Sequence, residues 1–497
     1  MELTAMKQSL AQLQASQQAY NHVMALLQTD GETAAPEAAS KARGETMAFF
    51  SQKSYELLVN EDTRALLDGL WACREELDGD TLRQVELLRK DLDDLTRIPM
   101  EEVVEYSMLC NDSTTAWLQA KANNDYASFE PYLAKIIEFK RRFAAYQDPD
   151  RPAYEVLLDD YEKGMTTAAL DEFFGMLRKE IVPLIEQVRA LPPKPAFVGR
   201  FCPLERQRAF SDYLMDLIGL DKTRCIIGET EHPFTSGMNR WDVRITTHYY
   251  TDAVLSSMYS VIHEGGHAQY ELGVNEKYYG TVLGGTSSTG LHESQSRFYE
   301  NIIGHDPAFL RLLMPKMQEF FPEAMEGVSE KELLLGANYV EPSLIRTEAD
   351  QVTYPLHIMV RYELEKQLIA GTLSTKELPE AWNRLYKEYL GIDVPNDTMG
   401  VLQDTHWSGG MMGYFPTYAL GSAYSSQILH AMKKDIDVDA LLEKGEIAPI
   451  TDWLNSHIHC WGNRYDPMEL LEKATGEAFN PTYYVEHLKK VIGELLA

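Results

Sequence analysis

Residues 258–272 read Met-Tyr-Ser-Val-Ile-His-Glu-Gly-Gly-His-Ala-Gln-Tyr-Glu-Leu, an apolar run with the spacing of a helix. Within this run, His263 and His267 enclose a His-Glu-x-x-His motif. Residues four apart on a helix lie one turn up and only about 40° apart around the axis, so both imidazoles can reach one point. Two neutral imidazoles at this separation suit a tetrahedral Zn²⁺, and the carboxylate of Glu264 can reach a water on the metal. The stretch predicts a zinc centre on a helix.

Two glycines, Gly265 and Gly266, occupy the middle of the same predicted helix. Each costs about 1 kcal/mol relative to alanine, which a sequence accepts where a backbone must approach closely. The competing interpretation is a pair of core histidines that share this spacing by chance. The glycines and the rarity of the pentapeptide favour the metal centre over that interpretation.

A third ligand is required, and the region after the motif offers two candidates. The metzincin extension is excluded, because Tyr270 and Gly273 stand where its glycine and last histidine belong. Downstream, His292 or Glu293 can complete a His₃ or His₂Glu site that leaves a fourth position for water. Glu300, seven residues after Glu293, is a candidate hydrogen-bond partner for a ligand imidazole.

The rest of the chain predicts a mostly α fold with a small sheet. Helical periodicity dominates residues 1–190, where a helix over 167–191 should bend at Pro183. Residues 241–246 alternate apolar and polar side chains, which indicates a half-buried strand. A strand bordering a cleft can pair its free edge with an extended peptide, although burial inside a sheet explains the pattern equally well.

Composition limits the possible partners and compartment. A net charge of −30 argues against binding nucleic acid or anionic membranes, because phosphate would repel this surface. The five scattered cysteines form no C-x-x-C and suit a reducing compartment. With neither a secretory leader pattern nor 18 consecutive apolar residues, we expect a cytoplasmic protein.

Six separated motifs carry a family resemblance. They are His232-Pro233-Phe234; Asp242-Val-Arg244-Ile-Thr246; His263-Glu264-Gly-Gly-His267; His292-Glu293-Ser294-Gln295; Ile345-Arg346-Thr-Glu-Ala349-Asp350; and Gly400-Val-Leu-Gln403-Asp404-Thr-His406-Trp407. Together, in this order and over the full length, they resemble the carboxypeptidase Taq (M32) family of zinc metallocarboxypeptidases.

The resemblance implies that Glu293 is the third metal ligand and Glu264 the catalytic base. It also implies a single helical domain over 1–497 with a deep active-site groove, similar to neurolysin and angiotensin-converting enzyme, and a homodimer. We expect residues 1–190 to form a wall or lid and the dimer region, and residues 225–430 to carry the active site. Zn²⁺ is the expected metal, with Co²⁺ as a substitute.

Two further roles need side chains outside the motif helix. The oxyanion of the tetrahedral intermediate needs a donor besides the metal, for which Tyr414, Tyr418 and His406 are candidates. Resemblance to converting-enzyme-like peptidases favours Tyr418, and ordinary packing is the alternative for each tyrosine. Arg346 is the candidate reader of the substrate's free C-terminal carboxylate; an ion pair with Asp350 is the alternative.

The sequence therefore predicts a zinc metallocarboxypeptidase acting on peptides with a free C-terminus. One alternative is a zinc endo-oligopeptidase of the same fold, which would share every zinc residue but lack a carboxylate reader. A non-catalytic acidic helical scaffold is the other. A closed structural zinc site is usually rich in cysteine, and no cysteine lies near the motif, which disfavours the scaffold.

Overall fold

The computed structural model describes residues 2–189 and 191–496. Over these ranges the chain forms helices and one small three-stranded sheet, which lies beside the helix that carries the motif. The expected mostly α fold is confirmed. None of the helices in these ranges is both long enough and apolar enough to cross a membrane.

Helices fill the chain up to the proline-rich segment 192–195. They are α1 (Leu3–Thr33), α2 (Ser40–Leu58), α3 (Glu61–Ala72), α4 (Gly79–Arg97), α5 (Met100–Asn123), α6 (Tyr126–Gln147), α7 (Ala153–Leu158), α8 (Thr167–Glu180) and α9 (Val182–Val188). The bend predicted at Pro183 is a break between α8 and α9, with the proline in the first turn of α9, where its missing N–H costs nothing.

Helix α4 illustrates how sequence sets these elements. The Asp78 side chain caps it by accepting the Thr81 N–H at 2.9 Å. Val85 and Leu88, three residues apart, are fully buried, as the periodicity predicts. Leu95 continues the same pattern near the C-terminal end of the helix but is 42% exposed.

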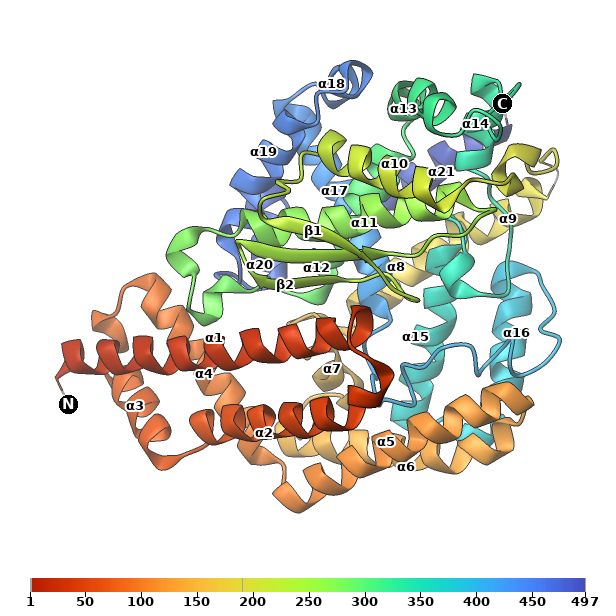
Figure 1. The fold of residues 1–497 in the computed structure, drawn as a ribbon. Coiled ribbons are helices and arrows are strands. Elements are labelled where there is room, and N and C mark those ends of the chain that lie inside the picture. Colours follow the sequence, from red (N-terminus) through yellow and green to blue (C-terminus); the bar gives the residue numbers. More distant parts are fainter. Residues whose placement is uncertain (1, 190, 497) are drawn as a thin grey trace.

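The sheet has the order β1-β3-β2, built from β1 (Cys225–Glu229), β2 (Thr235–Asn239) and β3 (Asp242–Thr247). Strand β3 confirms the strand predicted over 241–246, shifted by one residue. It pairs parallel with β1 and antiparallel with β2. Because β3 is central, both of its edges are occupied, and the idea that this strand offers a free edge is wrong. The outer strand on the α1 side is β2 (Figure 1).

The remaining helices form the larger part of the molecule. They are α10 (Leu204–Leu217), α11 (Val254–Gly273), α12 (Thr289–Arg297), α13 (Pro307–Phe320), α14 (Glu330–Ala337), α15 (Tyr354–Ala370), α16 (Leu378–Leu390), α17 (Pro416–Asp435), α18 (Val438–Lys444), α19 (Ala448–His457), α20 (Pro467–Thr475) and α21 (Thr482–Leu496). In Figure 1, α10 and α11 lie above the sheet and α1 lies below it.

Two separate hydrophobic clusters hold the chain together. The large one runs from α5 to α21 and includes the sheet. The small one belongs to α1–α4 and consists of Met6, Leu10, Leu13, Leu58, Leu67, Leu70, Val85, Leu88 and Leu92. We call α1–α4 the N-terminal helices and the remainder the body.

Candidate metal centre and active site

The predicted motif helix is α11, and its two glycines lie where other elements press against it. A Cβ on Gly265 would come 2.3 Å from the Ile218 side chain. On Gly266 it would come 2.6 Å from the carbonyl oxygen of Gln295, a backbone atom of α12. The close approach inferred from the sequence is therefore an α11–α12 backbone contact, and it explains why glycine is accepted in mid-helix.

Helix α12 carries Glu293 and is fixed from several sides. Ser288 caps its first turn, and the buried Glu162 accepts the Gly290 N–H at 3.0 Å. Behind it, α17 approaches so closely that a Cβ on Gly421 would lie 2.6 Å from Cγ of Glu293. With α11 on one side and α17 on the other, the position of the Glu293 side chain is set by packing.

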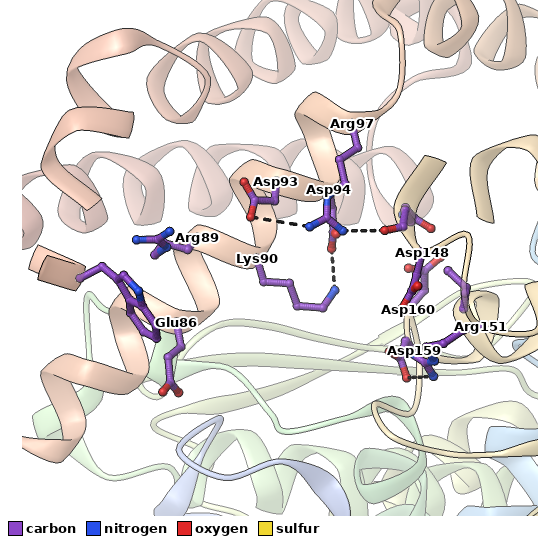
Figure 2. A pocket seen from close by; sticks show the side chains of 13 residues that line it. Glu86, Arg89, Lys90, Asp93, Asp94, Arg97, Asp148, Arg151, Asp159 and Asp160 are labelled. Atoms are coloured by element: carbon purple, nitrogen blue, oxygen red, sulfur yellow. Dashed lines mark hydrogen bonds and ion pairs between the residues drawn. The ribbon is translucent and has the colours of Figure 1, made fainter. Parts of the chain in front are cut away.

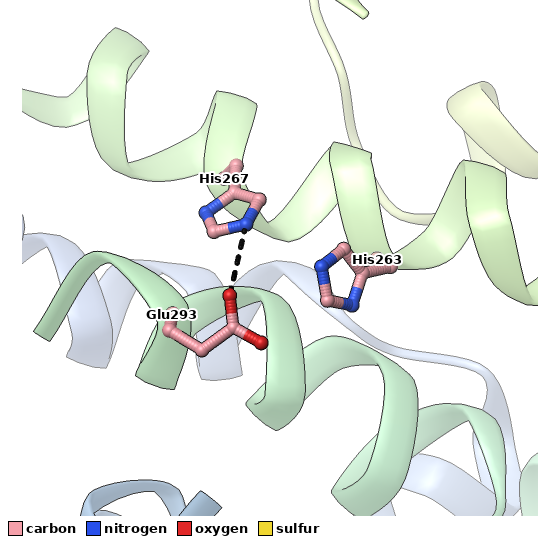
Figure 3. Close-up of side chains that lie close together, drawn as sticks. All are labelled: His263, His267 and Glu293. Carbon is pink, nitrogen blue, oxygen red and sulfur yellow. Dashed lines mark ion pairs between the residues drawn. The ribbon is translucent and has the colours of Figure 1, made fainter. Parts of the chain in front are cut away.

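Figure 3 shows the result, with His263 and His267 projecting from α11 toward Glu293 on α12. One potential ligand atom from each residue lies within 4.8 Å of the other two. His267 Nε2 is 3.6 Å from Glu293 Oε2, and the two imidazole rings are 5.0 Å apart. The structure brings together two histidines and one carboxylate, three residues that sequence analysis proposed as ligands.

Charged neighbours hold these three side chains in place. His263 Nδ1 lies 2.7 Å from Glu300 Oε2, the contact expected from sequence, and this leaves its Nε2 for a metal. Arg297 donates to Glu293 Oε1 at 2.7 Å and to Glu300 at 3.0 Å. Burial opposes ionisation of Glu300, but Arg297 and His263 outweigh it and lower the pKa of Glu300 to about 2. Both carboxylates are thus ionised at neutral pH.

The donor set fits a divalent metal. Burial lowers the pKa of His267 to about 3, so its imidazole is neutral and keeps a lone pair for a metal. Arg297 holds the pKa of Glu293 below its usual range, against the effect of burial. Two imidazoles and one carboxylate, with Arg297 and Glu300 behind them, form a donor set suited to a divalent metal ion.

His292, the other candidate from sequence, occupies a different place. Its Nε2 lies 3.1 Å from Glu271 Oε1, and its ring stacks on His267 at 4.2 Å. It therefore supports the ring of His267 and lies outside the group of three. His459 has a supporting role as well: it is buried, and its Nε2 lies 2.8 Å from Gln295 Oε1 on α12.

Glu264 lies on α11 with its carboxylate held by the sheet. Thr235 of β2 donates its hydroxyl to Glu264 Oε2 at 2.6 Å. Glu264 is only 7% exposed, and burial raises its pKa above the usual value. A carboxylate with a raised pKa takes up a proton more readily, as a general base requires.

Arg346 is buried in an ionic network. Its Nε and Nη2 donate to Asp404 Oδ1 at 3.0 and 2.9 Å, and its Nη1 donates to the Tyr354 hydroxyl at 2.9 Å. Asp350, the partner considered from sequence, instead accepts backbone N–H groups at the start of α15. Arg361 also pairs with Asp404, at 2.5 Å. Arg346 thus has an acidic partner, but one supplied by the distant Gly400–Trp407 motif.

The three candidate oxyanion donors gather beside Arg346. The Tyr418 ring lies 5.1 Å from the Arg346 guanidinium and 5.3 Å from the Tyr414 ring. His406 Nε2 is 3.4 Å from the Tyr418 hydroxyl, and burial lowers the pKa of His406 to about 4. A neutral imidazole and two phenols therefore share one wall with the arginine.

Tyr354 connects this wall to the metal centre. Its hydroxyl bonds Arg346, while its ring lies 4.5 Å below the guanidinium of Arg297, which holds Glu293. Tyr354, Arg297, Asp404 and Thr235 were missed as functional candidates. The spacing of four from Glu293 to Arg297 was a signal, and Asp404 lies inside a quoted motif. Only the three-dimensional structure could reveal the other two.

A cavity of about 350 Å³ lies apart from these residues, between α4 and the segment 147–160 (Figure 2). Charged side chains line it, and many of them pair with one another, such as Lys90 with Asp94 and Arg151 with Asp159. None of the predicted site residues lines it. The cavity belongs to the region where the N-terminal helices meet the body.

The fold and the site together define a helical metallopeptidase, with a His-Glu-x-x-His helix facing a glutamate from a second helix. The sequence pattern of the carboxypeptidase Taq (M32) metallopeptidase family matches residues 9–492. The chain belongs to this family, and it is therefore a metallocarboxypeptidase, a hydrolase of peptide bonds. The resemblance found in the six motifs is confirmed.

Relatives match over nearly the whole chain. Carboxypeptidase 1 of Bacillus subtilis is 39% identical over 479 residues, 96% of each protein. Among solved structures, the M32 carboxypeptidase of Deinococcus radiodurans has a TM-score of 0.96 at 34% identity and covers 99% of both chains. A Pyrococcus furiosus carboxypeptidase in a form described as Apo-Mg gives the same values.

Proposed function

We propose that the protein removes C-terminal residues from peptides with a zinc ion held by His263, His267 and Glu293. The observation that carries the proposal is the meeting of these three donors within 4.8 Å, with Glu264 on the same helix as the two histidines. Zinc suits the two imidazoles and the carboxylate, and Co²⁺ is the expected substitute.

The chain's own residues perform the proton transfers. A bound zinc ion would acidify a coordinated water and polarise the scissile carbonyl. Glu264 takes the proton from the attacking water and later delivers it to the departing amine. Its burial, which raises its pKa, favours this alternation between carboxylate and acid.

Tyr418, Tyr414 and His406 are proposed to donate hydrogen bonds to the developing oxyanion. Tyr418 is favoured because its ring lies against Arg346 and its hydroxyl is within 3.4 Å of His406, so two neighbours fix its position. Phenol donors are strong enough for this purpose in a site from which water is excluded.

Arg346 is proposed to bind the substrate's C-terminal carboxylate. A guanidinium has five N–H groups, and the hydrogen bonds to Asp404 and Tyr354 use three, which leaves one on each terminal nitrogen. Two parallel N–H groups meet a carboxylate in the fork geometry that arginine provides. Asp404 fixes the guanidinium from behind.

An assay with free and C-terminally amidated peptides tests the carboxypeptidase assignment. Arg346→Ala should slow hydrolysis of free peptides by roughly 10²-fold, as expected for loss of a buried ionic contact, while amidated peptides, already poor substrates, change little. Arg361 still pairs with Asp404 in this variant, so the fold should survive. Equal slowing of both substrates would assign Arg346 a structural role and favour an endopeptidase.

The metal assignment has its own test. His263→Ala, His267→Ala and Glu293→Ala should each release zinc, measured by elemental analysis of the purified protein. Full zinc occupancy in Glu293→Ala would disprove the third-ligand assignment. Reconstitution with Zn²⁺ or Co²⁺ then identifies which ions restore activity.

Strand β2 is proposed to border the substrate, since it is one of the two edge strands and its Thr235 reaches Glu264. An extended peptide can add to such an edge through backbone hydrogen bonds. We further propose one catalytic domain over 1–497, in which residues 1–190 wall or cover a deep groove.

We propose a homodimer of roughly twice 56.5 kDa, which light scattering at micromolar concentration would test. A cytoplasmic location is supported by five free cysteines, because a reducing compartment keeps thiols unpaired.

A further inference from the structure

The side chain that holds Glu264 comes from the sheet, and its geometry is specific. The Thr235 hydroxyl lies 2.6 Å from Glu264 Oε2 and 3.1 Å from the backbone carbonyl oxygen of the same residue. A hydroxyl has one proton, and the shorter contact, to a carboxylate oxygen, receives it. Such a charge-assisted bond is about twice as strong as one between neutral groups.

The backbone around Thr235 keeps this hydroxyl in place. Thr235 pairs with Ile245 of the central strand, and the Thr246 N–H donates to the carbonyl oxygen of Phe234 at 2.9 Å. Two residues further along β2, Gly237 lies against Glu271, which is seven residues after Glu264 on α11. Alternate residues of β2 therefore face one side of α11, and the strand is a rigid support for its carboxylates.

We propose that Thr235 is a positioning residue for the general base: its hydroxyl occupies Glu264 Oε2 and thereby leaves Oε1 as the oxygen that takes the proton from water. The inference rests on the proposed role of Glu264. Without this bond the carboxylate of a glutamate can turn about its last side-chain torsion, and the fraction of molecules with a correctly placed oxygen falls.

Thr235→Val tests the proposal, because valine keeps the β-branched shape that a strand favours and removes only the hydroxyl. We expect kcat to fall by roughly tenfold or more with KM within about twofold, since general base catalysis contributes about 10²–10⁴-fold and the base is displaced but present. Thr235→Ser retains the hydroxyl and should restore kcat to within about threefold of the wild-type value.

Thr372→Val is the matched control, because it makes the same substitution at an exposed residue just past the end of α15. It should leave kcat unchanged. Zinc content and thermal unfolding are measured for every variant, and Thr235→Ala replaces Thr235→Val if the latter folds poorly. A Thr235→Val enzyme with wild-type kcat, or a Thr235→Ser enzyme as slow as Thr235→Val, would overturn the proposal.

The variant Glu264→Gln separates this inference from the proposed function. If Thr235 acts through Glu264, adding Thr235→Val to Glu264→Gln should change the residual rate by less than about twofold, because coupled residues are non-additive. A full additional loss in the double variant would contradict the positioning role. An active Glu264→Gln enzyme would instead refute the general base itself.

Discussion

The N-terminal helices and the body differ in how they are held together. The N-terminal helices share a small apolar cluster of their own, whereas the body has one continuous core that also encloses charged side chains such as Arg361 and Glu365. Ion pairs contribute to the contacts between the two parts, alongside the packing of α1 on β2 and of Leu87 on the body's core. Asp80 of α4 pairs with Lys277 and Arg464 of the body, each at 2.8 Å.

A second junction repeats this arrangement. Asp466 of the body accepts hydrogen bonds from Arg83 of α4 and from Lys163, and the charged cavity of Figure 2 lies along the same boundary. Interfaces of this polar kind permit relative motion more readily than apolar ones. Changes in the body should therefore affect chemistry and global stability, while changes at the boundary should affect how the two parts sit together.

The largest expected effect is chemical and confined to the body. Glu264→Gln should lower kcat by roughly 10³–10⁴-fold, because the amide cannot accept the proton from water. Zinc content and the unfolding temperature should stay close to the wild-type values. Glu75→Gln, an exposed acid among the N-terminal helices, is the control and should leave kcat unchanged. Equal loss of metal and activity in Glu264→Gln would show that Glu264 is structural.

Core truncations should separate the two parts by their unfolding behaviour. Leu88→Ala and Leu310→Ala each remove a fully buried side chain, from the small and the large cluster respectively, and should each cost about 2–5 kcal/mol. We expect calorimetry of Leu88→Ala to show an early transition before the main one, and Leu310→Ala to lower the main transition. A single shifted transition in both variants would mean that the two parts unfold as one.

A pH titration of stability tests the ionisation of Glu365, a carboxyl group buried in the body. Burial raises the pKa of Glu365 to about 7 from an ordinary 4.5, although Trp407, Gly413 and Tyr154 donate hydrogen bonds to it. Between these two pKa values the folded state binds more protons than the unfolded state, so stability falls as pH rises from about 4.5 to 7 and is then constant.

Glu365→Gln removes this titration. Relative to the variant, the wild-type protein should therefore lose about 2–3 kcal/mol of unfolding free energy between pH 5 and pH 7.5. The effect of the Gln substitution itself on stability does not change with pH, so it cancels in this comparison. Denaturant melts of both proteins at the two pH values measure the difference. A pH-independent difference would contradict the raised pKa.

Asp78, which caps α4 of the N-terminal helices, behaves in the opposite way to Glu365. Hydrogen bonds from Thr81 lower the pKa of Asp78 to about 2, so the contribution of Asp78 to stability is lost only in acid.

The smallest effect belongs to the boundary. Asp466→Asn weakens its pairs with the buried Arg83 and the partly exposed Lys163. Asp466 itself is partly exposed, and ion pairs that water can reach are worth about 0–1 kcal/mol each. We expect a small loss of stability that disappears in 1 M salt, and a change of a few-fold in kcat/KM for peptides. A loss of several kcal/mol in unfolding free energy that persists in high salt would show that the boundary is packed like the core.

The sequence was most informative where local chemistry fixes structure. The period of α4, the strand near Val243 and the two imidazoles of α11 follow from spacing alone. Strands β1 and β2 were not predicted, because β2 contains Gly237 and neither strand shows a clean alternation.

Contacts between distant segments could not be predicted from spacing. Arg346 pairs with Asp404, 58 positions away, in place of the near neighbour Asp350. The hydroxyl of Thr235 finds Glu264 only because the sheet packs on α11. Such pairings depend on how the elements assemble, which no local pattern records.

The close packing of α12 between Gly266 and Gly421 limits how this protein can be engineered. Replacing a helical glycine with alanine is a standard route to higher thermostability, worth roughly 0.5–1 kcal/mol where the site is open. At these two positions a methyl group would meet the Gln295 carbonyl oxygen or the Glu293 side chain and push α12 away from its neighbours. A stabilised variant should therefore carry its new alanines at other positions. At Gly266 or Gly421, alanine would favour the helix but would increase the distance between Glu293 and the two histidines.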